Sequence, residues 1–387
     1  MAGPTNLQVL LGVIAAVAVL ALVLAIVAVA RVGVNPILGA IRPAGLLQET
    51  QPVLMAYAET WQRGNPVYQN PANAPTGPYG AGSLSTYILA FCNLSFTKVG
   101  GNILIGGLNA TNADPYYDGG TMTLQNFINA VKANNTKVWV SLGGATIQAA
   151  ALDNLVPLDV VSATTQYGIN GWDVDFEAPY DAKDFFNKMQ ALQYAIKSAS
   201  SLTTLCLDVE GTQVAQAKNN KYAYIFPNGG NGMFDFLSIQ AYNFCYPTDV
   251  TAAINSSVPG DIPVAIQTYG FHPSQIILGI NPGLDECSGG GFAFRTSDAQ
   301  AAATYVKNNG LGGMFIWSAQ RDSVTPLTGE SDSTNIIAPP NLWFAFGTGA
   351  GENGIPWNAP WPAANQNVTD AGGDGLFAQT ILDVFRA

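Results

Sequence analysis

The stretch Ile169-Asn170-Gly171-Trp172-Asp173-Val174-Asp175-Phe176-Glu177 alternates acidic and apolar side chains. Alternate side chains of a β-strand point to the same face, so Asp173, Asp175 and Glu177 share one face and the apolar residues share the other. In a barrel, the apolar face packs against helices and the acidic face enters the interior. Crowded, buried carboxyls raise one another's pKa, which suits a general acid. The alternative, a solvated strand at a sheet edge, fits poorly with so apolar an opposite face.

Short β-like runs recur along the chain on both sides of this stretch. We expect strands at Val53–Ala58, Tyr87–Cys92, Lys137–Leu142, Gly171–Glu177, Leu205–Glu210, Phe236–Asn243, Ile276–Ile280 and Gly313–Ser318. Helical spacing of apolar residues predicts helices at Asp181–Ser200, Ser297–Asn308 and Leu376–Phe385. Strands that start roughly 30–40 residues apart with helices between them predict an α/β fold, a single (β/α)8 TIM barrel. An open doubly wound sheet is the competing fold, but no G-x-G-x-x-G or Walker pattern supports it.

The composition excludes several classes of function. The 387-residue chain has a net charge of −11 and only 11% charged residues, against about 25% in an average soluble domain. Nucleic-acid binding requires clustered Lys and Arg, so we expect no nucleic-acid partner. The single histidine, His272, excludes a His-rich zinc site. Its place beside a proline favours an exposed loop, and we expect neither a metal nor a cofactor.

The N-terminus accounts for part of this charge deficit. The run Leu7–Ala30 carries no charged residue and is long enough to cross a ~30 Å hydrocarbon core. We therefore expect a transmembrane anchor at 1–30, a linker at 31–50 and the barrel at 51–387, with a lipid bilayer as partner through 7–30. Ala28-Val29-Ala30 resembles a signal cleavage site, and cleavage would release a secreted protein. The length of the run and the lack of a preceding basic residue argue against cleavage.

The sequence carries two opposing signals for the side of the membrane on which the barrel lies. Arg31 and Arg42 follow the span, a weak signal that this side stays cytoplasmic. Glycosylation sequons would suit a barrel on the external or lumenal side, or on a virion membrane; they begin at Asn93, Asn109, Asn134, Asn255 and Asn367. We favour the external or lumenal placement.

Four cysteines lack the close spacing of a metal site. Cys92 and Cys206 lie in or beside apolar runs, which favours buried thiols. Cys245 and Cys287 follow two successive predicted strands and are candidates for a disulfide.

Four segments together resemble one known family. The Asn170–Glu177 segment is similar to the D-G-x-D-x-D-x-E signature of family 18 glycoside hydrolases, the chitinases and their relatives. Three other segments resemble the S-x-G-G, M/Q-x-Y-D/N and G-G-x-x-x-W elements of that family, in the same order: Ser141-Leu142-Gly143-Gly144, Gln240-Ala241-Tyr242-Asn243 and Gly313-Met314-Phe315-Ile316-Trp317-Ser318. Two departures are Asn170 in place of the first Asp, and Glu210 where a small or neutral residue is expected.

The resemblance implies a TIM barrel and a retaining mechanism assisted by the substrate. Glu177 would be the general acid, and Asp175 would orient the acetamide of the substrate. Asp173 would share the charge or proton of Asp175, and Tyr242 would donate to the acetamide oxygen. The implied substrate-binding residues are Trp317, which would stack on a sugar ring, and Asn243, Gln240, Ser141, Gly144 and Tyr57. This chemistry requires neither a metal nor a cofactor.

The resemblance leaves three functions open. The first is hydrolysis of β-1,4-linked N-acetylglucosamine polymers such as chitin. The second is a catalytically silent carbohydrate-binding or structural surface protein, such as a virion component. Such proteins often lack the acidic Glu, which this chain keeps at Glu177. The third is an endo-β-N-acetylglucosaminidase, which would use the same acidic residues. In each case the expected partner is an amino-sugar polysaccharide or oligosaccharide.

Overall fold

The computed structural model describes residues 52–59, 84–108, 123–133, 135–242, 258–281, 283–284, 293–294, 296–319, 322 and 376–387. All of them belong to one compact unit, Gly45–Ala387. Its centre is a closed barrel of eight parallel strands in the order β1-β12-β9-β8-β7-β6-β5-β2. The predicted TIM barrel is therefore confirmed, and the open doubly wound sheet is excluded.

The barrel strands lie where the sequence predicts them. They are β1 (Val53–Glu59), β2 (Thr86–Cys92), β5 (Lys137–Gly143), β6 (Gly171–Asp175), β7 (Thr204–Glu210), β8 (Phe236–Gln240), β9 (Ile276–Ile280) and β12 (Gly313–Ile316). Three predicted runs were too long, because β6 ends at Asp175, β8 ends at Gln240 and β12 ends at Ile316. The Gly144 amide donates to the Asp175 carbonyl (2.6 Å) where β6 ends. Glu177 therefore lies in the loop that follows the strand.

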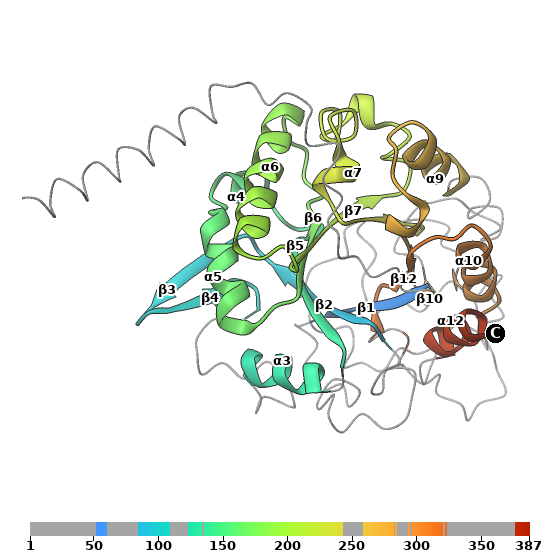
Figure 1. Cartoon of the computed structure of the whole chain (residues 1–387), viewed down its shortest axis with the longest axis horizontal. Coiled ribbons are helices and arrows are strands. Elements are labelled where there is room, and N and C mark those ends of the chain that lie inside the picture. Colours follow the sequence, from blue (N-terminus) through green and yellow to red (C-terminus); the bar gives the residue numbers. More distant parts are fainter. Residues whose placement is uncertain are drawn as a thin grey trace, which may run out of the picture. The chain divides into compact units, whose positions relative to one another are not determined.

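Helices surround the strands in Figure 1. The described helices are α3 (Leu124–Ala133), α4 (Ala149–Asp153), α5 (Pro157–Tyr167), α6 (Ala182–Ala199), α7 (Gly230–Met233), α9 (Val258–Gln267), α10 (Thr296–Asn308) and α12 (Leu376–Arg386). Short 3-10 turns occupy Ala217–Asn219 and Pro273–Gln275. The helices predicted from spacing correspond to α6, α10 and α12.

Helix α6 shows why the sequence signal is strong. The Asp181 side chain caps its N-terminus by accepting from the Lys183 and Asp184 amides, each at 2.9 Å. One face of the helix is buried, formed by Phe185, Met189, Leu192 and Ile196 at helical spacing. Cap and apolar stripe therefore agree on where the helix begins and which side faces the barrel.

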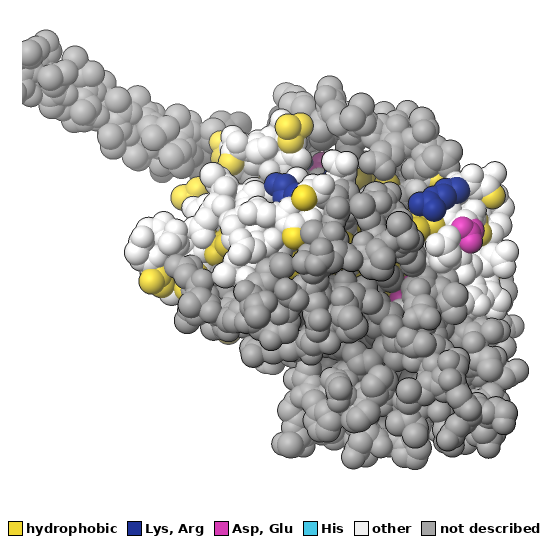
Figure 2. Space-filling view, turned by 90° about the horizontal axis from the view of Figure 1, so that it is seen from below, with side chains coloured by type: hydrophobic (Ala, Val, Ile, Leu, Met, Phe, Trp, Pro, Cys, Tyr) yellow, Lys and Arg dark blue, Asp and Glu magenta, His cyan; other side chains and the backbone are white. Residues whose placement is uncertain are grey.

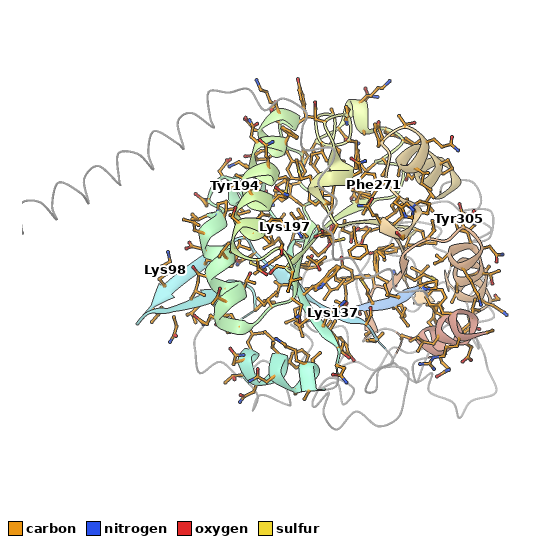
Figure 3. The ribbon with its side chains drawn as sticks, viewed as in Figure 1. Lys98, Lys137, Tyr194, Lys197, Phe271 and Tyr305 are labelled. Atoms are coloured by element: carbon orange, nitrogen blue, oxygen red, sulfur yellow. The ribbon has the colours of Figure 1, made fainter. Side chains whose placement is uncertain are left out.

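Two hairpins outside the barrel were not predicted. β3 (Phe96–Val99) pairs with β4 (Asn102–Ile105) through Gly100 and Gly101, both at positive φ, as a two-residue turn requires. Lys98, at the left of Figure 3, forms a 2.6 Å ion pair with Asp159 of α5. A second small pair joins β10 (Gly283–Leu284) to β11 (Ala293–Phe294).

The predicted alternation along β6 is confirmed. The Trp172 indole donates to Thr164 Oγ1 of α5 at 2.7 Å, and the Phe176 ring stacks on Phe185 of α6. Asp173 faces the opposite way, where its carboxyl accepts from the Tyr57 hydroxyl of β1. The acidic face of this strand therefore lies inside the barrel.

Several predictions concern residues outside the described ranges. These are the anchor, the linker, Asn243, the pair Cys245 and Cys287, and every sequon asparagine except Asn93. Among the described residues, no helix is long and apolar enough to cross a bilayer. Cys92 and Cys206 are buried free thiols, as predicted. On the described part of the face in Figure 2, charged side chains are few, in keeping with the charge-poor composition.

Candidate active site

The candidate site lies at the carboxyl ends of the barrel strands, the end at which TIM barrels carry their active sites. β6 supplies Asp173 and Asp175, and its register places them beside Ser141 and Gly143 of β5. Glu177 follows β6 and is half-buried. Seven parallel strands and their following loops contribute polar and aromatic groups to the site: β1, β2, β5, β6, β7, β8 and β12.

The Gly143-Gly144 pair allows the ends of β5 and β6 to approach each other. Both residues have positive φ, 124° and 88°. A Cβ on Gly143 would lie 2.1 Å from the Asp175 carbonyl oxygen, and one on Gly144 would lie 2.7 Å from the Phe91 ring. Only glycine fits both positions. Gly144, predicted to bind substrate, thus contributes its amide to the backbone of Asp175.

Asp173 is the most strongly hydrogen-bonded carboxyl of the site. It is fully buried, and its Oδ2 accepts from Ser141 Oγ at 2.6 Å and from the Tyr57 hydroxyl at 2.8 Å. Burial raises the pKa of Asp173 to about 6, while the hydrogen bonds from Ser141 and Tyr57 act to lower it. At neutral pH this carboxyl is therefore mainly ionised.

Asp208 of β7 is a fourth carboxyl that the sequence reasoning missed. It is 1% exposed, and its Oδ2 lies 2.7 Å from the same Tyr57 hydroxyl oxygen. Burial first, and the nearby charge of Asp173 second, raise its pKa well above the usual value. A period-2 signal was present, since Asp208 alternates with the apolar Leu207 and Val209.

Asp175 lies between the buried carboxyls and Glu177. Gln240 of β8 donates to its Oδ1 at 3.3 Å. Burial raises its pKa well above the usual value, and the charge of Glu177 contributes in the same direction. Asp175 therefore tends to hold a proton, the condition expected for a carboxyl that shares a proton with its neighbours.

An aromatic cluster adjoins the carboxyls. Trp317, which follows β12, stacks on Phe91 of β2, with ring centroids 5.3 Å apart and planes at 25°. The Tyr57 ring packs edge-on against Trp317 at 5.3 Å and against Phe315 at 5.2 Å, and Tyr242 contacts Phe315 in turn. Trp317 and Phe91 are both half-buried, so part of the surface of each ring stays exposed. Phe91 was not predicted as a site residue.

Lys221 brings a positive charge close to the carboxyls. It is 7% exposed and lies over the Phe176 and Tyr222 rings, 5.8 and 5.1 Å from their centroids. Burial lowers the pKa of Lys221, while Glu210 and Asp175 act to raise it. It lies in an irregular segment between β7 and β8, which gave no periodic signal.

The structure thus brings together most of the predicted site residues: Asp173, Asp175, Ser141, Gln240 and Tyr57 by direct hydrogen bonds, Tyr242 and Trp317 through the aromatic cluster. Glu177 lies two residues beyond Asp175, and Asn243 falls outside the described residues. His272 is exposed and caps a 3-10 turn, as its sequence context suggested. In the described parts of the chain, no cluster of His, Cys, Asp or Glu has the arrangement of a metal site.

No known family profile matches the sequence, and no curated protein matches it. Solved structures match in fold. The family GH18 chitinase from Cycas revoluta, in complex with allosamidin, has a TM-score of 0.51 at 14% identity and covers 70% of this chain and 96% of its own. YKL-39, solved with chitooligosaccharides, has a TM-score of 0.50 at 14% identity and covers 70% and 93%.

A Streptomyces coelicolor protein assigned as chitinase A gives a TM-score of 0.50 at 19% identity, over 70% of this chain and 93% of that one. At these identities the likeness concerns the fold. The resemblance found in the four sequence segments and the match of the whole barrel lead to the same result: this chain has the fold of the family 18 chitinases.

Proposed function

We propose that this chain is a glycoside hydrolase that cleaves β-1,4-linked N-acetylglucosamine polymers and retains the anomeric configuration. The observation that carries the proposal is the arrangement on β6. Asp173 and Asp175 are buried, Asp173 with the donors Ser141 and Tyr57 and Asp175 with the donor Gln240, and Glu177 follows at the half-buried rim. In the family that the sequence resembles, a glutamate at this position would donate the proton and the neighbouring carboxyls would support it.

Glu177 would act as the general acid. It would protonate the glycosidic oxygen as the bond from that oxygen to the anomeric carbon breaks. The acetamide oxygen of the same sugar would attack the anomeric carbon and form an oxazolinium ion. Water would then open this ring and pass a proton to the Glu177 carboxylate, which restores the acid.

Asp175 would accept a hydrogen bond from the acetamide N–H. The pKa of Asp175 is raised by burial first and by the charge of Glu177 second, so an ionised Glu177 favours the protonated form of Asp175. Two donors hold Asp173 below them in place. Tyr242 would donate to the acetamide oxygen, and Trp317 would support the sugar from below by stacking.

A second function is favoured by one comparison. YKL-39, a protein solved with chitooligosaccharides, shares the fold as closely as the chitinase does. The same aromatic cluster of Trp317, Phe91 and Tyr57 would suit binding without hydrolysis. The presence of Glu177 favours the hydrolase, and an endo-β-N-acetylglucosaminidase would use the same residues on N-glycans.

The test compares three full-length proteins in a mild detergent: wild type, Glu177→Gln and the control Asp184→Asn. Asp184 is an exposed acidic residue on α6. With chito-oligosaccharides, we expect wild type and Asp184→Asn to release reducing ends at similar rates, and Glu177→Gln to be slower by at least 100-fold, the usual contribution of a general acid being 10²–10⁴. Binding without release by the wild type would support the silent lectin. Release of glycan from a glycoprotein, without cleavage of chito-oligosaccharides, would support the endo-β-N-acetylglucosaminidase.

We also propose that residues 7–30 anchor the barrel to a membrane, with the barrel on the external or lumenal side. The uncharged run Leu7–Ala30 supports this proposal. Cell fractionation tests it: the full chain should remain with membranes at high pH and high salt. A chain that begins after residue 30 in an N-terminal sequence of the mature protein would instead show a secreted product.

A further inference from the structure

The Tyr57 hydroxyl takes part in two short contacts with carboxyl oxygens. Its oxygen lies 2.8 Å from Asp173 Oδ2 and 2.7 Å from Asp208 Oδ2. A phenol has one proton and can donate to only one of them. The other contact needs a proton from its own carboxyl, because two unprotonated oxygens at this distance repel each other. At least one of the two carboxyls is therefore a neutral acid.

The remaining contacts indicate which carboxyl holds the proton. Asp173 Oδ2 also accepts from Ser141 Oγ at 2.6 Å, so it has a second donor that stabilises a negative charge. The Oδ1 atoms of Asp173 and Asp208 are both buried with no hydrogen-bond partner, so the two carboxyls differ in their other donors. Asp173 has the Ser141 hydroxyl besides Tyr57, whereas Asp208 has Tyr57 and the Gln240 amide, which also donates to Asp175. Burying an ionised carboxylate with so little support is costly. The neutral acid is therefore Asp208.

We propose that Asp208 is a positioning residue of the site: its protonated carboxyl donates to the Tyr57 oxygen, so that the Tyr57 hydroxyl donates to Asp173. The result is a directed chain from Asp208 through Tyr57 to Asp173. Ser141 and Tyr57 then both point their protons at Asp173 and hold it as a carboxylate. In its catalytic consequence this inference rests on the proposed hydrolase function, but the protonation of Asp208 does not.

Other groups near Asp208 are mainly acidic or neutral. Asp173 and Glu177 raise the pKa of Asp208 by their charge, and Gln240 and Tyr57 lower it by hydrogen bonding. Asp208 in turn acts on further groups packed around it, which are Asp175, Cys206 and Tyr222. The groups that surround Asp208 therefore favour its neutral form.

Asp208→Asn is the informative variant, because the amide keeps the shape and the donor while it cannot ionise. Asp208→Leu introduces an apolar side chain of similar size and removes the hydrogen-bond donor. If Asp208 is neutral in the folded chain, the wild type must keep a proton that the unfolded chain releases above pH of about 3.9. The pKa of Asp208 is then higher in the folded chain than in the unfolded chain, so the stability that the protonated carboxyl contributes is lost as the pH rises.

The first arm of the test measures unfolding of the full-length chain in urea at several pH values. We expect the unfolding constant of the wild type, relative to that of Asp208→Asn, to rise by up to about tenfold per pH unit until Asp208 ionises in the folded state. A ratio that is flat or falls with pH would show a charged Asp208 and overturn the proposal. This measurement does not require catalytic activity.

The second arm measures hydrolysis of chito-oligosaccharides. We expect Asp208→Asn to keep kcat within about threefold of the wild type, because its amide donates to Tyr57. Asp208→Leu should lose at least tenfold in kcat with KM unchanged, because the Tyr57 hydroxyl is no longer directed at Asp173. Loss in both variants would show that a carboxylate is needed and would overturn the proposal. An inactive wild type would count against the hydrolase function, and the first arm would still decide on Asp208.

Discussion

Replacing Ser141 with alanine removes one of the two hydrogen bonds to the buried Asp173 carboxyl. Ser141 Oγ donates at 2.6 Å, and the Tyr57 hydroxyl remains at 2.8 Å. A hydrogen bond to a charged group contributes about 1.5–3 kcal/mol to stability, and one between neutral groups about 0.5–1.5 kcal/mol. The variant should therefore lose roughly 1 kcal/mol more when Asp173 is ionised than when it is protonated. This difference corresponds to a pKa of Asp173 that is higher by about one unit.

The pH dependence follows from the sign of the shift. The folded-state pKa of Asp173, about 6, lies above the value of about 3.9 for an unfolded chain. The stability that this group contributes is full below pH ~3.9 and is lost as the pH rises through about 6. Ser141→Ala raises the folded pKa further, so its extra loss appears between about pH 6 and pH 8.

Urea unfolding followed by tryptophan fluorescence provides the assay, at about pH 5 and about pH 8. Ser85→Ala is the matched control, because Ser85 Oγ donates to the uncharged Leu54 carbonyl at 3.0 Å. Its loss of stability should be the same at both pH values. If Ser141→Ala also loses the same free energy at both, Asp173 is not the ionised acceptor of this site and the reasoning is refuted.

Three further variants test the site and its support. Gly144→Ala should lower stability by about 2–3 kcal/mol in thermal unfolding, since an L-residue is strained at this positive φ and its Cβ would meet the Phe91 ring at 2.7 Å; an unchanged Tm would contradict this. Lys197→Met should lower it by about 3 kcal/mol without loss of ligand binding, because it leaves the buried Asp235 carboxylate without its 2.5 Å ion pair; a stable variant would show that the pair contributes little. Trp317→Ala should weaken binding of chito-oligosaccharides roughly tenfold by calorimetry, and unchanged affinity would exclude it as a sugar platform.

The barrel could be predicted from the sequence because its signals are local. Alternation along Gly171–Asp175 separated the interior carboxyls from the helix-facing apolar side chains, and the residues between strands showed helical spacing. Strand ends were less certain: β6 ends at Asp175, whose carbonyl accepts from the Gly144 amide, two residues before Glu177. That contact depends on the meeting of two strands and leaves no mark in the sequence of either.

The site could be predicted only in part, for the same reason. Asp208 carried the period-2 signal of an interior residue, yet its importance comes from Tyr57, 151 positions away. Phe91 resembles any other buried-strand aromatic until the structure places it against Trp317. Lys221 lies in an irregular segment without periodicity. Pairings between distant strands follow from barrel closure, which motif spacing does not encode.

In the proposed mechanism, the acetamide of the substrate and Glu177 together carry out a retaining hydrolysis. Proton NMR of a chito-oligosaccharide mixed with the full-length wild type tests it most directly, by recording which anomer of the new reducing end forms first. We expect the β-anomer in the first spectra, with the α-anomer growing later by mutarotation, and no early product with Glu177→Gln. Initial formation of the α-anomer, or equal rates for the two proteins, would contradict it.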